Sequence, residues 1–156
     1  MPQPQVRPER TGWRDKIISY RHRLWGWDCP AVDVDFLMLE YDTAEPIALV
    51  EYKNEHAGFV KPEHPSYRAL RRLADRAGVS LFVARYGSDC SWFRAMPLNR
   101  KARVLLPNAT RMTEEEWVSF LYKLRGREAP REVLEAIRRA RERGVLLPDD
   151  LDDLPW

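Results

Sequence analysis

Apolar residues recur along the chain at two spacings, which predict helices and strands in turn. Between residues 13 and 25 they lie three or four positions apart, which predicts an amphipathic helix ended by Gly26. Residues 32–41 and 47–53 are apolar, extended runs on either side of polar turn residues, a pattern typical of a β-hairpin. The front of the chain therefore predicts a helix followed by a hairpin.

The middle of the chain repeats both patterns. Residues 54–65 lack periodicity and predict a loop, and the helical spacing that follows ends at Gly78. Residues 79–86 and 92–98 are apolar runs separated by turn residues, which predicts two further strands.

The last third of the chain predicts two helices. Thr113 and Glu116 have the spacing of a capping box, so a helix is expected from there to about residue 124. A second helix is expected over residues 130–143. The whole order predicts an α/β fold in which helices flank a mixed, four-stranded sheet, with a C-terminal helical extension. Residues 1–110 would form the core, with a short N-terminal arm, and 111–156 the packed C-terminal helices and an acidic tail.

Composition sets the broad class. A chain of 156 residues fits one domain, and 44% hydrophobic residues is too many for a disordered chain. No apolar run is long enough to cross a bilayer, and the polar N-terminus lacks the apolar segment of a signal peptide. The two cysteines do not make a disulfide framework, so we expect a cytoplasmic protein without a membrane partner.

Charge is divided unevenly along the chain. The net charge is only +2, but residues 1–111 hold 18 Lys and Arg against 13 Asp and Glu, whereas 112–156 hold 8 against 11. A basic front of this kind indicates contact with nucleic acid.

The predicted hairpin carries acidic residues within apolar strands. Asp33 and Asp35 have the even spacing that places both on one strand face, as do Glu51 and Lys53. Pairing about the turn would set Asp35 beside Lys53 and diagonal to Glu51, close enough for two carboxylates to share one cation. A structural ion cluster at a strand end would give the same pattern. Two carboxylates beside a lysine also suit Mg²⁺-assisted hydrolysis of a phosphodiester, and Mn²⁺ would substitute.

These residues carry a family resemblance. Asp35, followed after fifteen residues by Glu51-Tyr52-Lys53, resembles the signature of the PD-(D/E)XK nuclease superfamily, which includes restriction endonucleases and Holliday-junction resolvases. The resemblance covers about residues 13–98, and it implies a restriction-endonuclease-like core with the signature on its hairpin. It implies that Asp35 and Glu51 bind the metal, with the Tyr52 carbonyl as a further ligand, and that Lys53 is the catalytic lysine.

The chain departs from that pattern near the first acid. Pro30 lies three residues before Asp33, so Asp33 is a rival to Asp35 as the first metal ligand. Many members add an acid from the first helix, for which Asp15 and Glu9 are the candidates here.

Basic and aromatic residues near the signature are candidate DNA contacts. They are the ones that the first helix and the start of the second would present: Arg21, His22, Arg23, Tyr67, Arg68 and Arg72. The expected function is a Mg²⁺-dependent deoxyribonuclease, of phage, mobile-element, repair or defence origin. The alternatives are a branched-DNA resolvase acting as a homodimer and a non-catalytic DNA-binding or assembly module. A homodimer or a protein partner bound through the C-terminal region would supply specificity.

Overall fold

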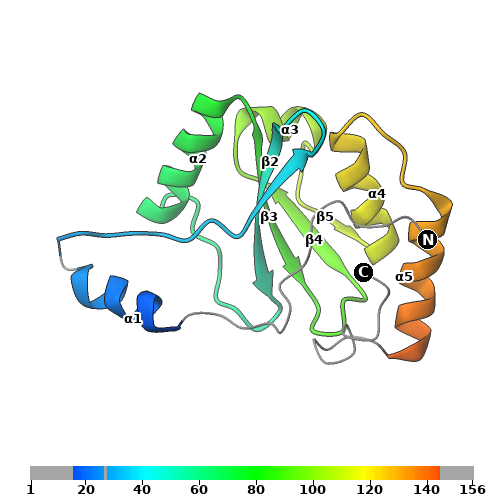
Figure 1. Ribbon diagram of the computed structural model, residues 1–156, viewed down its shortest axis with the longest axis horizontal. Helices are drawn as coiled ribbons and strands as arrows, with labels where there is room; N and C mark the ends of the chain where they lie inside the picture. The colour runs from blue at the N-terminus through cyan, green and yellow to red at the C-terminus, as the bar shows by residue number, and fades with distance from the viewer. Residues whose placement is uncertain (1–15, 27, 145–156) are drawn as a thin grey trace.

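A computed structural model describes residues 16–26 and 28–144 of the chain (Figure 1). These residues form five helices and five strands. In order they are α1 (Lys16–Trp25), β1 (Phe36–Glu40), β2 (Glu45–Asn54), α2 (Pro65–Ala77), β3 (Ser80–Tyr86), β4 (Phe93–Pro97), α3 (Arg100–Leu105), β5 (Thr110–Met112), α4 (Glu114–Leu124) and α5 (Arg131–Arg143).

The strands form one mixed sheet in the order β1-β2-β3-β4-β5. β2 and β3 are parallel and are joined through α2, whereas the other neighbouring pairs are antiparallel. In Figure 1, α2 lies on one side of the sheet and α4 and α5 lie on the other, while α1 stands apart. The fold is therefore α/β with a mixed sheet flanked by helices, as the sequence predicts.

The expected number of four strands is wrong by one. β5 and the six-residue helix α3 were not expected, because elements of three and six residues are too short for hydrophobic periodicity to reveal.

Alternation along the strands divides the core into two clusters. Leu49, Leu81 and Val83 face α2, where Leu70 and Ala74 cover them. A second cluster lies on the other face, where Trp117 of α4 packs against β2, β3 and β4; its buried members are Val50, Phe82, Ala84, Phe93, Ala95, Ala102, Leu106 and Trp117. Because alternate residues of a strand point to opposite faces, the same strands pack against α2 on one face and against α4 on the other.

Several helix ends match their sequence signals. Thr113 and Glu116 form the capping box at the start of α4. Gly78 ends α2 and Gly144 ends α5, each with a positive φ near 70° that glycine adopts without a Cβ clash. His64 caps α2, because its Nδ1 accepts a hydrogen bond from the Ser66 N–H.

The hairpin register differs from the one expected. β1 begins at Phe36, which pairs with Val50, so Asp35 lies level with Glu51 and not with Lys53. The turn is tighter than assumed, because Glu40 already pairs with Glu45, and an irregularity between Met38 and Leu39 shifts the register again. The strand expected from residue 32 is correspondingly shorter.

Two polar contacts fix the outer parts of the fold. Arg125, just after α4, forms two hydrogen bonds to the Glu40 carboxylate at 2.8 and 3.2 Å, and this pairing lowers the pKa of Glu40. Asn99 is buried beside the start of β3; it accepts from the N–H groups of Leu81 and Ala102 and donates to the Val79 carbonyl and the Asp75 carboxylate. Among the helices described, none is long and apolar enough to cross a membrane.

Candidate active site

Two carboxylates meet where β1 separates from β2. The Asp35 N–H donates to Oε1 of Glu51 at 3.3 Å, and Oδ2 of Asp35 accepts from the Tyr52 N–H at 3.0 Å. The Asp35 side chain thus occupies the position of a strand partner, which explains why the ladder stops at Phe36. The sequence-predicted pair, Asp35 and Glu51, is brought together by this arrangement.

Glu51 is an unusual residue for a buried position in a strand. Its side chain is only 7% exposed, and the described residues place no cation within ion-pair distance of it. Burial, with a further contribution from the Asp35 carboxylate, raises the pKa of Glu51 to about 7. A divalent cation would relieve the repulsion between two ionised carboxylates at this point.

A hollow of about 320 Å³ opens beside Glu51. Lys53 lies two residues further along β2 and therefore shares the face of Glu51, and both side chains line the hollow. The rest of the wall comes from the segment before β1, the loop after β2 and the first two turns of α2. The residues that line it are Val32, Glu51, Lys53, Phe59, Lys61, His64, Ser66, Tyr67 and Leu70.

Tyr52, between the two site residues, points to the opposite face of the sheet. Its hydroxyl accepts a hydrogen bond from Nε1 of Trp117 at 3.2 Å, and its ring packs edge-on against Phe36, Tyr86 and Trp117. This aromatic packing holds the strand from behind, so the backbone that carries Glu51 and Lys53 is fixed.

The oxygen donors at this point suit a hard cation such as Mg²⁺. Asp35 and Glu51 supply carboxylates, and the Tyr52 N–H faces Asp35, so the Tyr52 carbonyl leaves the strand on the same side. The described residues contain no group of three Asp, Glu, His or Cys side chains able to hold a metal. Two carboxylates, a carbonyl and water are therefore the ligand set available.

Asp33 lies beside a different hollow. It lines a space of about 600 Å³ together with His22 and Arg23 of α1, and Val32 borders both hollows. Asp35, the preferred first ligand, makes the contact with Glu51. Asp15 and Glu9, the candidates for a further acid, lie outside the described residues, as does the acidic C-terminal tail.

Comparison with known proteins identifies no relative of this chain. No protein-family model matches the sequence, and neither curated proteins nor solved structures give a match.

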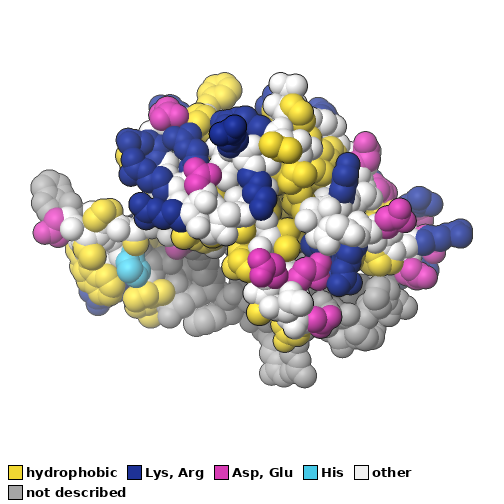
Figure 2. Space-filling model, turned by 90° about the horizontal axis from the view of Figure 1, so that it is seen from above, with side chains coloured by type: hydrophobic (Ala, Val, Ile, Leu, Met, Phe, Trp, Pro, Cys, Tyr) yellow, Lys and Arg dark blue, Asp and Glu magenta, His cyan; other side chains and the backbone are white. Residues whose placement is uncertain are grey.

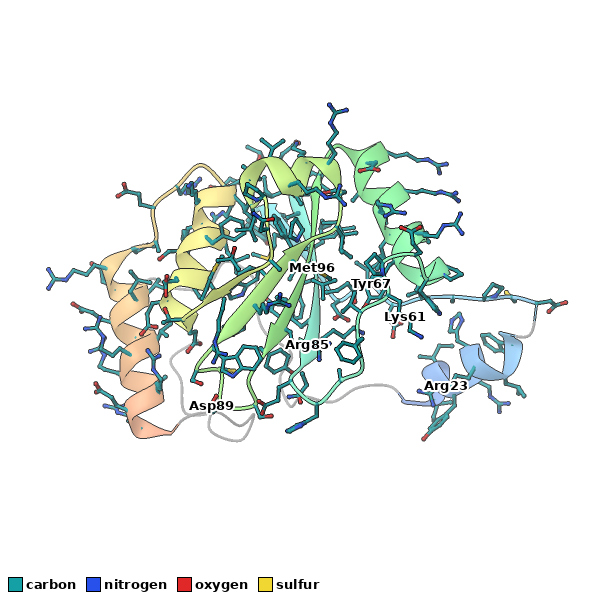
Figure 3. The ribbon with its side chains drawn as sticks, turned by 180° about the vertical axis from the view of Figure 1, so that it is seen from behind. Arg23, Lys61, Tyr67, Arg85, Asp89 and Met96 are labelled. Atoms are coloured by element: carbon teal, nitrogen blue, oxygen red, sulfur yellow. The ribbon has the colours of Figure 1, made fainter. Side chains whose placement is uncertain are left out.

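The expected DNA contacts fall into three groups. Tyr67 lines the hollow beside Lys53, next to Lys61 in Figure 3. Arg68 and Arg72 are exposed on α2, and Figure 2 shows Lys and Arg side chains gathered over this end of the molecule. The candidates on α1 stand apart from the hollow, as Arg23 does in Figure 3: Arg21, His22 and Arg23.

Sequence reasoning missed part of the wall. Lys61 adds a second ammonium to the hollow, and Ser66 adds a hydroxyl at the start of α2. His64, which the sequence offers either as a phosphate or metal contact or as an ordinary loop histidine, lines the hollow as well as capping the helix. The available signal was their place in the sequence, in the loop between β2 and α2 or in the first turn of α2.

Proposed function

We propose that this protein is a Mg²⁺-dependent nuclease that hydrolyses DNA phosphodiester bonds. The observation that carries the proposal is the contact of Asp35 with the buried Glu51, with Lys53 lining the same hollow as Glu51. A structural ion cluster would neutralise Glu51, whereas its pKa is raised to about 7. Two neighbouring carboxylates without a cation between them are a typical arrangement of metal ligands, because a bound cation would offset their mutual repulsion.

Each residue has a role that its position supports. Asp35, Glu51 and the Tyr52 carbonyl would hold the cation, which, when bound, supplies Lewis-acid polarisation of the phosphate and a lowered water pKa. The Lys53 ammonium offsets the negative charge that develops on the phosphate and orients the attacking water. Lys61 and Tyr67, which line the same hollow, would hold a neighbouring phosphate, so that the scissile phosphate is positioned for in-line attack by the water.

The element order supports the same proposal. A hairpin carries the acidic residues, a helix follows, and two further strands extend the sheet beside it. This is the order that the resemblance to the PD-(D/E)XK nucleases implies, and a restriction-endonuclease-like core is therefore part of the proposal. Cleavage would leave a 5′-phosphate and a 3′-hydroxyl.

A cleavage assay tests the function directly. The purified protein is incubated with Mg²⁺ or Mn²⁺ and single-stranded, duplex, flapped or four-way-junction DNA, and products are resolved on denaturing gels. We expect cleavage that EDTA abolishes. Paired, two-fold symmetric cuts restricted to junctions would instead identify a homodimeric resolvase. DNA binding with every substrate left intact would identify a non-catalytic module and contradict the proposal.

Metal affinity should depend on pH in a defined way. Because Glu51 must lose its proton to bind a cation, Mg²⁺ affinity should rise about ten-fold per pH unit below pH 7 and level off above it. The raised pKa also means that, in the metal-free protein, the contribution of Glu51 to stability is lost as pH rises from about 4.5 through 7. Isothermal titration calorimetry between pH 5.5 and 8.5, about 1.5 units to either side of the pKa, measures the affinity.

The Glu51→Gln variant is the control for this titration. It keeps the size of the side chain but removes the titrating group, so its residual Mg²⁺ affinity should change little over the same range. A wild-type affinity that does not vary with pH would contradict the assignment of Glu51 as a ligand.

A further inference from the structure

Four basic residues lie side by side across the sheet, starting at the candidate active site. Lys53 of β2 is in register with Arg85 of β3, Arg85 with Arg94 of β4, and Arg94 with Arg111 of β5. Residues in register point to the same face, so these four side chains form one row, called here the basic row. Like charges directly opposite one another destabilise a sheet, so the row costs stability unless an anion covers it.

The basic row lies on the α2 face but beyond the helix. Leu49, Leu81 and Val83 occupy the covered part of this face, and the row crosses the uncovered part. A hollow of about 490 Å³ opens there, with Arg85 and Arg94 in its wall. Figure 3 shows Arg85 over the middle of the sheet, away from the helices. Arg94 and Arg111 are exposed, whereas Lys53 and Arg85 are half-buried, so the row is open to solvent mainly at its β4 and β5 end.

The protein itself does not neutralise the row. Within residues 16–26 and 28–144, no carboxylate lies within ion-pair distance of Arg94 or Arg111, and both are exposed. The guanidinium of Arg111 stacks over the Trp92 ring at 4.7 Å, which fixes its direction. Glu55, the acid in the hollow, accepts a hydrogen bond from the Ser88 N–H and lies 3.5 Å from His56.

Phe59 stands between the two hollows. It lines both the hollow beside Glu51, called here the catalytic hollow, and the hollow that contains Arg85 and Arg94. Phe59 is 95% exposed. The loop that presents it is held by Arg85, which donates to the carbonyls of Asn54, Ala57 and Gly58 at 2.6–3.1 Å. These contacts use three of the five guanidinium N–H groups and leave two for a ligand. An apolar ring held out in water in this way suits stacking on a base.

We infer that an unpaired DNA strand leaves the catalytic hollow along the basic row, with a base stacked on Phe59 and its phosphates on Arg94 and Arg111. The inference rests on the proposed nuclease function and names its substrate class: DNA with a single-stranded segment beside the cut. The row spans three strand spacings, about 14 Å, which accommodates only a few nucleotides. In an intact duplex the bases are stacked inside and offer no free face to Phe59.

The test is a binding titration in EDTA, where cleavage cannot occur. Fluorescence anisotropy follows the binding of fluorescein-labelled oligothymidylate, and of a hairpin duplex of equal nucleotide count, at several salt concentrations. The double variant Arg94→Ala/Arg111→Ala should bind the single strand at least ten-fold more weakly. Its salt slope should also fall by about 1.4, since each phosphate contact on a single strand contributes about 0.7.

Two further variants separate charge from stacking. Arg138→Ala/Arg139→Ala removes the same charge from the exposed surface of α5 and should leave single-strand affinity unchanged. Phe59→Ala should weaken single-strand binding by about ten-fold with the salt slope unaltered, because stacking releases no counterions.

The outcomes distinguish this inference from the proposed function. The inference would be overturned if the α5 variant and the basic-row variant lost single-strand affinity equally. It would also be overturned if the wild type bound the duplex more tightly than the single strand, even with Mg²⁺-dependent cleavage present. Row-dependent binding to the single strand without cleavage under any metal would leave the strand path standing and remove the nuclease function.

Discussion

Replacing Lys53 with alanine is expected to lower the DNA cleavage rate by about 100- to 1,000-fold, the cost of removing one preorganised group that stabilises transition-state charge. Lys53 lines the same hollow as Glu51, so its ammonium lies where charge would develop on a bound phosphate. It stabilises that charge more in the transition state than in the ground state, so kcat should carry most of the loss and KM little of it. Single-turnover cleavage with excess enzyme measures the effect.

The matched control is Lys123→Ala. Lys123 is exposed on α4, on the other side of the sheet, so its loss changes the net charge equally without touching the site. Mg²⁺ affinity should survive in both variants, because neither residue is a metal ligand. A Lys53→Ala enzyme that cleaves within a factor of about three of wild type, less than 1 kcal/mol in barrier, would remove Lys53 from the mechanism.

The largest expected effect on stability comes from Asn99→Ala. The buried Asn99 amide bonds to the N–H groups of Leu81 and Ala102 and to the Val79 carbonyl, so it joins β3 to the start of α3. Alanine would leave these backbone groups without partners and remove the N-cap of α3. We expect the free energy of unfolding to fall by about 3 kcal/mol.

Urea and thermal unfolding, followed by circular dichroism, measure this loss. For a chain of this size it corresponds to a fall in Tm of about 10 °C. Asn108→Ala is the control, because Asn108 is exposed and lies in the loop before β5, and it should shift Tm by less than 2 °C, a change of about 0.5 kcal/mol. Equal shifts in Tm for Asn99→Ala and Asn108→Ala would show that the hydrogen bonds of the buried amide do not stabilise the fold.

The sequence predicts the long elements because they repeat a pattern several times. The 13 residues of α2 and the seven of β3 each contain enough apolar positions to define a period and a buried face. Thr113 and Gly78 act through local backbone chemistry, so they mark helix ends without knowledge of the fold. The Asp35–Glu51 pair could also be predicted, because both acids lie in apolar stretches of sequence that form the two arms of one hairpin.

The parts that could not be predicted depend on contacts between distant segments. The register of the hairpin depends on the length of its turn and on the irregularity after Met38, neither of which the sequence reveals. Because the turn is tighter than assumed, every residue pair of the hairpin is shifted. Lys61 and Ser66 enter the site only because α2 packs on the sheet. The basic row cannot be seen in the sequence, where consecutive members are up to 32 positions apart; it follows from the order and register of the strands.

The contacts of Arg85 with the loop after β2 also determine when the site can assemble during synthesis. The hairpin with Asp35, Glu51 and Lys53 can form as soon as it leaves the ribosome, since its pairing is local. The loop at residues 54–58 is fixed only after β3 has emerged and paired in parallel with β2, a non-local and slow event. A nascent chain that ends before residue 85 thus carries the candidate site residues without the Arg85 contacts that fix the loop beside them.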